Sequence, residues 1–199
     1  MLFPENDIKT IAVFRALQLG DLLCSIPALQ ALRSAYPSAH ISIIGMPWMK
    51  ALPERFPSCF DEFIGFPGYP GLPEQALDTA RTIDFLTEMK NRKFDLAIQM
   101  QGNGSVVNPM LELFGARYNA GYCRKEDYYP GKGFMEYPAA IPEIHRHLLL
   151  MHHLGIYYAS DKLKFPVMQK DRDDLQAASL NIQSGSYICV HPGSRGGWR

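Results

Sequence analysis

Short apolar segments alternate with segments of helical periodicity along this chain, and no other feature of the sequence constrains the fold as strongly. Strand-like segments are predicted at 8–15, 40–45, 60–66, 94–100 and 117–122, with a further strand and turn at 187–194. Helical periodicity is predicted for 22–36, 74–92, 106–115, 143–156 and 171–181. This alternation is typical of βαβ units, so we expect an α/β fold with a parallel, Rossmann-like sheet.

The length of the chain bounds its domain organisation. It has 199 residues, enough for one large domain or for one domain with part of another. The last residues follow directly on a strand and a turn, where a domain rarely ends. We therefore expect a first domain at 1–155, a connector at 156–185 and, at 186–199, the opening of a second domain that is mostly absent.

Composition and charge exclude several classes of protein. Hydrophobic residues make up 47% and charged residues 20%, and the formal net charge is zero, which gives no general basis for binding nucleic acid. No apolar run reaches the length of a membrane span, and the amino terminus lacks the pattern of a signal peptide. The four cysteines are far apart, so reduced thiols in a cytoplasmic protein are expected rather than a disulfide framework or a metal site.

Asp21 lies where the first predicted strand gives way to a helix, in the stretch FRALQLGDLLCSIP (14–27). It can be an acid in the first turn of the helix, favoured by the free N–H groups and the helix dipole. It can also be a general base that takes a proton from a sugar or alcohol hydroxyl. Gly20 beside it would let a ligand approach closely. The segment has too few glycines for a dinucleotide-binding or P-loop motif.

Two later junctions between strand and loop also offer groups to a ligand. The glycines of QGNGS (101–105) could present backbone amides, and HPGSR (191–195) follows an apolar segment. The groups suited to a phosphate there are the amide of Gly193, the hydroxyl of Ser194 and the cations of Arg195 and Arg199.

A histidine cluster invites a metal interpretation that the spacing does not favour. His145, His147, His152 and His153 fall in one predicted helix, but no HExxH pattern accompanies them. Packing or surface roles are expected instead, and we predict no metal site.

Together these stretches resemble glycosyltransferase family 9, the ADP-heptose:lipopolysaccharide heptosyltransferases and their relatives. The similarity begins with an apolar strand, Arg15, LGD (19–21), Pro27 and ALQALRSAYP (28–37). FDLAIQMQGNGS (94–105) is similar to the family's YDxxIDLQG stretch, with Gln99 where an acid is usual.

Two further segments carry the resemblance toward the end of the chain. HRHLLLMHHLGI (145–156) resembles the family's helix ending in LGI, with Arg146 at the position of its usual arginine and Pro142 where a histidine is often found. YICVHPGSRGGWR (187–199) is similar to the strand and HPG turn that open the family's donor domain.

The resemblance implies the N-terminal domain of a GT-B glycosyltransferase, in which two Rossmann-like domains face each other across a cleft. The N-terminal domain takes the acceptor and the C-terminal domain takes the nucleotide sugar, with no divalent metal and no cofactor beyond the co-substrate, ADP-heptose. Asp21 becomes the general base of an inverting transfer of heptose to a lipopolysaccharide-type saccharide. The implied acceptor-binding residues are Arg15, Gly20, Gln101, Gly102 and Arg146. The implied donor-binding residues are His191, Gly193, Ser194, Arg195 and Arg199.

The expected partners are a nucleotide sugar and a lipid-linked saccharide. We expect a cytoplasmic protein and leave open a peripheral contact with the inner face of the inner membrane. Two other functions stay open: an acceptor-binding module without activity in this chain, and another GT-B-like enzyme such as a nucleotide-sugar epimerase.

Overall fold

A computed structural model describes residues 1–126, 131–180, 183 and 185–190 of the chain. The chain divides into two compact units, Met1–Phe165 and Pro166–Arg199, and each is described by itself. The domain boundaries predicted at 155 and 185 stay a prediction.

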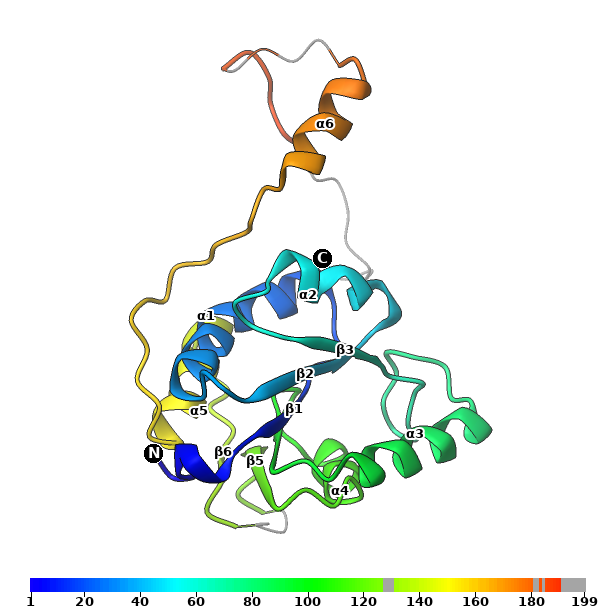
Figure 1. Cartoon of the computed structure of the whole chain (residues 1–199), viewed down its shortest axis with the longest axis vertical. Helices are drawn as coiled ribbons and strands as arrows, with labels where there is room; N and C mark the ends of the chain where they lie inside the picture. Colours follow the sequence, from blue (N-terminus) through cyan, green and yellow to red (C-terminus); the bar gives the residue numbers. More distant parts are fainter. Residues whose placement is uncertain (127–130, 181–182, 184, 191–199) are drawn as a thin grey trace. The chain divides into compact units, whose positions relative to one another are not determined.

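The first unit is built on one parallel sheet (Figure 1). Its strands are β1 (Thr10–Phe14), β2 (His40–Gly45), β3 (Glu62–Gly65), β4 (Leu96–Gln99), β5 (Tyr118–Cys123) and β6 (Phe134–Glu136). They are ordered β3-β2-β1-β4-β5-β6, and each neighbouring pair is parallel. This is the strand order of a doubly wound nucleotide-binding sheet. The predicted α/β class and Rossmann-like sheet are confirmed.

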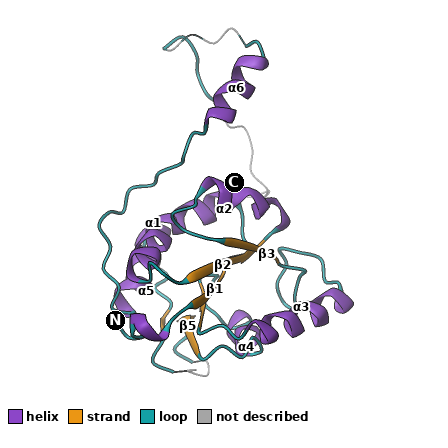
Figure 2. Ribbon diagram, in the orientation of Figure 1, coloured by secondary structure: helices purple, strands orange, loops and turns teal. Residues whose placement is uncertain are grey.

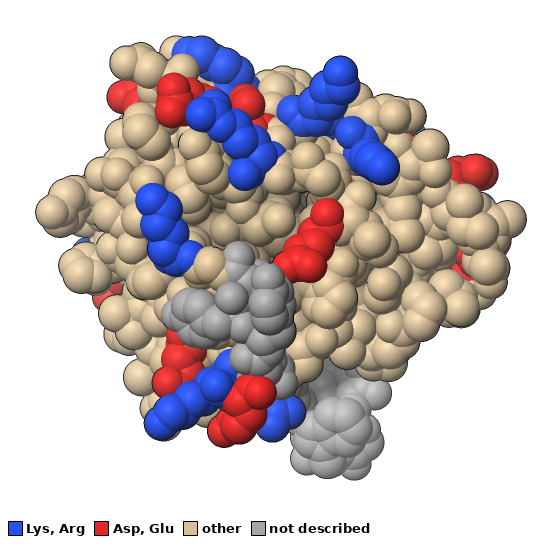
Figure 3. Space-filling view, turned by 90° about the horizontal axis from the view of Figure 1, so that it is seen from below, with Lys and Arg blue, Asp and Glu red and all other residues tan. Residues whose placement is uncertain are grey.

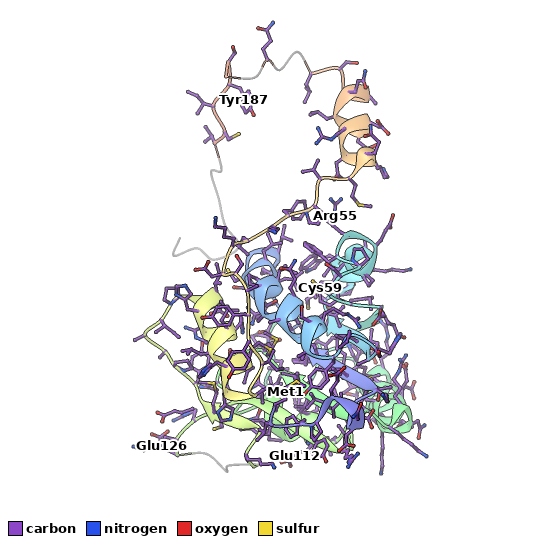
Figure 4. The ribbon with its side chains drawn as sticks, turned by 60° about the vertical axis from the view of Figure 1, so that its left-hand side comes forward. Met1, Arg55, Cys59, Glu112, Glu126 and Tyr187 are labelled. Atoms are coloured by element: carbon purple, nitrogen blue, oxygen red, sulfur yellow. The ribbon has the colours of Figure 1, made fainter. Side chains whose placement is uncertain are left out.

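Helices cover both faces of this sheet. The first unit contains η1 (Glu5–Asp7), α1 (Leu19–Ala35), η2 (Pro47–Ala51), α2 (Leu52–Arg55), α3 (Thr79–Arg92), α4 (Val107–Glu112) and α5 (Glu143–His153). Figure 2 shows α1 and α5 on one face and α3 and α4 on the other. The helices α1 and α5 pack side by side, as Figure 4 also shows.

The centre of the sheet is buried on both faces, which explains its sequence. In β1 every residue from Ile11 to Phe14 is fully buried, and all of β4 is buried as well. A strand with helices on both faces has no solvent side, so it reads as a continuous apolar run without alternation.

The start of α1 differs from the sequence prediction. The helix begins at Leu19, three residues before the predicted start at residue 22, so Asp21 lies in its first turn. Pro27 lies inside the helix and does not begin a new one. The hydroxyl of Ser25, within the same helix, donates to the carbonyl oxygen of Leu22 at 2.6 Å.

Two predicted segments also need correction. The segment 123–142, in which neither a strand nor a helix is predicted, contains the short strand β6 at the edge of the sheet. The strand predicted from residue 187 is not formed at 187–190, where Tyr187, Ile188 and Val190 are exposed and no described strand pairs with them. The rest of that segment, 191–194, lies outside the described residues.

The second unit contributes one described helix, α6 (Gln169–Ala177), which has no buried residue. None of the helices in the described parts of the chain combines the length and the apolar character needed to cross a membrane.

Candidate functional site

The strand order reverses between β1 and β4, and this places the candidate site. The chain leaves β1 for α1 on one face of the sheet and leaves β4 for α4 on the other (Figure 2). In open α/β sheets, ligands bind at the carboxyl ends of the strands where the order reverses. The loops that follow β1 and β4 therefore form the candidate site together with the first turn of α1. The loops contain Arg15, Gln101 and Gly102, and the first turn of α1 contains Gly20 and Asp21.

Asp21 is the third residue of α1 and is partly exposed. Its Oδ2 accepts a hydrogen bond from the backbone N–H of Gln18 at 3.3 Å, and the Gln18 side chain caps the helix in return. The predicted acid in the first turn of the helix is thus observed, and its carboxylate is partly open to solvent. A Cβ added to the exposed Gly20 would meet no atom within 4 Å, so there is room beside the carboxylate for another molecule.

Arg15 is fully buried directly behind this turn. Its Nε and Nη2 donate to the backbone carbonyl oxygen of Asp21 at 3.0 and 2.6 Å, and its Nη1 donates to the carbonyl oxygen of Met100. Nη2 also forms an ion pair with Glu143 at 2.9 Å. The guanidinium therefore joins the first turn of α1, the end of β4 and the start of α5. All three of its nitrogens are engaged with the protein.

Gln101 joins the same two loops from the β4 side. It is buried, and its Oε1 accepts from the backbone N–H of Ala16 at 2.8 Å. Its Nε2 has no hydrogen-bond partner among the described residues. Gly102 is exposed and has a φ of 57°, in the left-handed region that favours glycine.

Gln99 occupies the position where the family usually has an acid, and the structure gives its amide two uses. Its Nε2 donates to the carbonyl oxygen of Tyr122 at 2.8 Å, and its Oε1 accepts from the backbone N–H of Gln101 at 2.9 Å. An ionised carboxylate could make only the second bond, because it has no donor. Gln99 therefore links the end of β4 to β5 and to the following loop.

Glu143 was not predicted from the sequence, and it lies at the centre of the buried charges. Its Oε1 accepts from Arg15, and its Oε2 accepts from Arg146, three residues later on α5. The Nε2 atom of His147, one position further along, lies 3.2 Å from Oε1 without the geometry of a full hydrogen bond. The sequence did contain a signal for this cluster: Glu143 precedes Arg146 by three residues and His147 by four, a spacing that brings side chains together on one face of a helix.

Arg146 is mostly buried and is held by the segment before α5 as well as by Glu143. Its Nε donates to the carbonyl oxygen of Pro138 at 3.0 Å and its Nη2 to that of Ile141 at 3.1 Å. The guanidinium also lies 4.5 Å from the ring centre of Tyr137. Arg146 thus fixes the path of the chain from β6 into α5.

His147 packs in the core under this network and is neutral at pH 7. Burial lowers its pKa to about 4. Burial also raises the pKa of Tyr122, whose hydroxyl lies 3.0 Å from His147 Nδ1. In the neutral ring Nδ1 accepts from Tyr122, which leaves the proton on Nε2 facing Glu143. The His147 ring and the Arg15 guanidinium lower the pKa of Glu143 to about 2, so this group is a carboxylate.

These two pKa values predict that the protein loses stability in acid. Unfolded histidine takes up a proton below about pH 6.5, whereas His147 does so only near pH 4. In that window the unfolded chain binds more protons, so the free energy of unfolding falls as the pH falls. Glu143 also lowers the free energy of unfolding as the pH falls from 4.5 to about 2, because its pKa is lowered in the folded protein. We expect denaturant midpoints to decrease from pH 6.5 to 4, and His147→Gln to flatten this dependence. His152→Gln, an exposed histidine on the same helix, should leave the slope unchanged; if it flattens the slope equally, the assignment to His147 is wrong.

The predicted donor-binding residues cannot be placed. His191, Gly193, Ser194, Arg195 and Arg199 lie outside the described residues. Within the described residues, no group of three or more His, Cys, Asp or Glu side chains could hold a metal ion. On the face shown in Figure 3, basic and acidic side chains are interspersed, and uncharged residues cover most of the surface.

Comparison with known proteins identifies the fold but gives no match by sequence. No family model and no curated protein matches the chain. Among solved structures, the chain is similar to a glycosyl transferase family 9 protein from Veillonella parvula, with a TM-score of 0.69 and 18% identity over 93% of this chain and 53% of that one. It has the family 9 glycosyltransferase fold. This confirms, at the level of the fold, the resemblance predicted from the sequence.

Two heptosyltransferases from E. coli are also similar in fold to this chain. ADP-heptose lps heptosyltransferase II matches with a TM-score of 0.58 and 16% identity, over 89% of this chain and 52% of its own. Heptosyltransferase WaaC, solved with ADP-2-deoxy-2-fluoro heptose, matches with a TM-score of 0.55 and 13% identity, over 77% of this chain and 51% of its own. The chain thus spans about half the length of these three glycosyltransferase structures.

Proposed function

We propose that this chain is the acceptor-binding half of an inverting glycosyltransferase. The reaction would move heptose from ADP-heptose to a lipopolysaccharide-type saccharide. The observation that carries the proposal is the position of Asp21, a partly exposed carboxylate at the carboxyl end of the central strand, where the order of the sheet reverses. The shared fold supports the reaction class, and a relative solved with an ADP-heptose analogue supports the donor.

In the proposed reaction Asp21 acts as the general base. An acceptor hydroxyl would donate its proton to the carboxylate as its oxygen attacks the anomeric carbon of the donor. The bond from that carbon to the diphosphate oxygen breaks with its electron pair leaving on ADP, and attack from the opposite face inverts the anomeric configuration. The first turn of α1 suits a base, because the helix dipole favours the ionised carboxylate.

The other predicted residues take supporting roles in this proposal. Arg15 and Gln101 would hold the loops after β1 and β4, while Gly20 and Gly102 would leave space for the acceptor. The diphosphate would be bound by the segment that includes His191, Gly193, Ser194, Arg195 and Arg199. The enzyme would work in the cytoplasm, and a lipid-linked acceptor would bring it into peripheral contact with the inner face of the inner membrane.

The test uses the full-length protein with ADP-heptose and a deacylated core-lipopolysaccharide acceptor, and it measures release of ADP. We expect ADP release that depends on the acceptor, and a product of inverted anomeric configuration by NMR. Acceptor binding without ADP release would support the binding module instead. Conversion of the donor without acceptor would indicate an epimerase-like enzyme. If other nucleotide sugars react and ADP-heptose does not, the transferase remains and the heptose assignment is wrong.

A further inference from the structure

Glu143 holds three cationic or potentially cationic groups from a single position at the start of α5. One carboxylate oxygen accepts from Arg15 at 2.9 Å and the other accepts from Arg146. The Nε2 atom of His147 lies 3.2 Å from the first oxygen. Both oxygens are thus engaged with the protein, and the side chain is 29% exposed. A carboxylate with both oxygens occupied is poorly suited to take a proton from a substrate.

The link that matters for the reaction runs through Arg15. The Arg15 nitrogen that meets Glu143 also donates to the backbone carbonyl oxygen of Asp21 at 2.6 Å. The other nitrogens reach Asp21 again and the end of β4 at Met100. A guanidinium is planar and rigid, so a partner that fixes one nitrogen fixes the direction of all three. Glu143 therefore determines where Arg15 holds the backbone of Asp21.

We propose that Glu143 is a positioning residue of the transferase site, which acts through Arg15 to hold the carboxylate of Asp21 toward the acceptor hydroxyl. This rests on the proposed function, because it assumes that Asp21 is the base. Nothing in the sequence joins these residues, since Arg15 and Glu143 are 128 positions apart. Misplacement of a reacting group by about 1 Å can lower a rate by ~100-fold, so a loose Arg15 is expected to slow the chemical step.

A second ion pair of the same kind supplies a matched control. Glu62 accepts from two nitrogens of Arg92 at 2.8 and 3.0 Å, and its side chain is 31% exposed, close to the value for Glu143. Glu62 is the first residue of β3, at the amino edge of the parallel sheet, whereas Asp21 follows the carboxyl edge. Glu62→Gln thus removes a similar charge pair far from the proposed chemistry.

The experiment is a double-mutant cycle on the full-length enzyme, with ADP release measured from ADP-heptose and the deacylated acceptor. Glu143→Gln in the wild-type background is expected to lower kcat by ~10–100-fold, with KM for ADP-heptose unchanged. In the Asp21→Asn background, Glu143→Gln is expected to lower kcat further by less than about 2-fold, because both changes act on the same group. Glu62→Gln should leave kcat near that of the wild type in both backgrounds.

The outcomes separate the two proposals. An inactive wild-type enzyme overturns the proposed function together with the role of Glu143. An active enzyme that Asp21→Asn leaves unchanged overturns Asp21 as the base, and with it the role of Glu143. If Asp21→Asn lowers kcat but Glu143→Gln is as fast as Glu62→Gln, only the positioning role of Glu143 is overturned. An equal loss in both backgrounds also overturns it, because that is the pattern of general structural damage. If Glu143→Gln does not fold by near-UV circular dichroism, Glu143→Asp keeps the charge with a shorter reach and is expected to show the same non-additivity with a smaller loss.

Discussion

Replacement of Asp21 by asparagine is expected to lower kcat for ADP release by at least ~100-fold, the usual loss when a general base is removed. The amide cannot take the proton of the acceptor hydroxyl. It can still accept the hydrogen bond that Asp21 receives from the backbone N–H of Gln18, so the first turn of α1 should persist. The free energy of unfolding is therefore expected to change by no more than about 0.5 kcal/mol. Stopped assays of ADP release and urea unfolding of the same preparations measure both quantities.

The second unit offers a control for the helix cap. Asp171 is the third residue of α6, and its Oδ2 accepts from the backbone N–H of Met168 at 2.8 Å, as Asp21 does from Gln18. Asp171→Asn makes the same chemical change in the same local geometry and should leave kcat unchanged. If Asp21→Asn proves as active as Asp171→Asn, Asp21 only caps its helix and another group must act as the base.

The sheet could be predicted from the sequence because its strands are buried. The strand predicted at 40–45 is observed with those bounds, and the one predicted at 94–100 contains β4 (Leu96–Gln99). A central parallel strand is apolar throughout, and this signal depends only on local sequence. β6 was missed because three residues are too few to show a period of two.

The start of α1 was mispredicted for a physical reason that bears on the site. Leu19 is 48% exposed and Gly20 belongs to no apolar face, so the helical pattern becomes visible only at Leu22. The first turn instead depends on the reciprocal capping of Gln18 and Asp21, which hydrophobic periodicity does not report. Sequence reasoning found the functional candidate and placed it just outside the helix that positions it.

The partners of Arg15 could not be read from the sequence at all. The motif pointed to the residue, but the pairing with Glu143 requires that α1 and α5 pack together on one face of the sheet. Residues this far apart in sequence meet only through the folded topology. The role that the resemblance implies for Arg15, contact with the acceptor, stays a prediction, while the structure gives each of its nitrogens a partner within the protein.

Arg15→Met is expected to cost about 3–5 kcal/mol of folding free energy, the range found when one partner of a buried ion pair is removed. A buried pair can sometimes be replaced by apolar side chains at little cost, because neither charge is then left alone. That compensation is absent here, because Arg15 also satisfies the backbone carbonyl oxygens of Asp21 and Met100. Methionine fills much of the volume but donates no hydrogen bond, so both carbonyls and the carboxylate of Glu143 lose a donor.

Urea unfolding of the full chain, followed by circular dichroism, measures this loss, and Arg33→Met calibrates it. Arg33 also joins a carboxylate, that of Asp61, to a backbone carbonyl oxygen, that of Ala39, but its side chain is 18% exposed where Arg15 is fully buried. Water can replace part of what Arg33 provides, so its replacement should cost about 1 kcal/mol. Arg15→Lys should fall between the two methionine variants, because an ammonium keeps the charge but cannot span three partners in one plane. Equal losses for Arg15→Met and Arg33→Met would show that the buried network under Asp21 contributes no more to folding than a surface pair does.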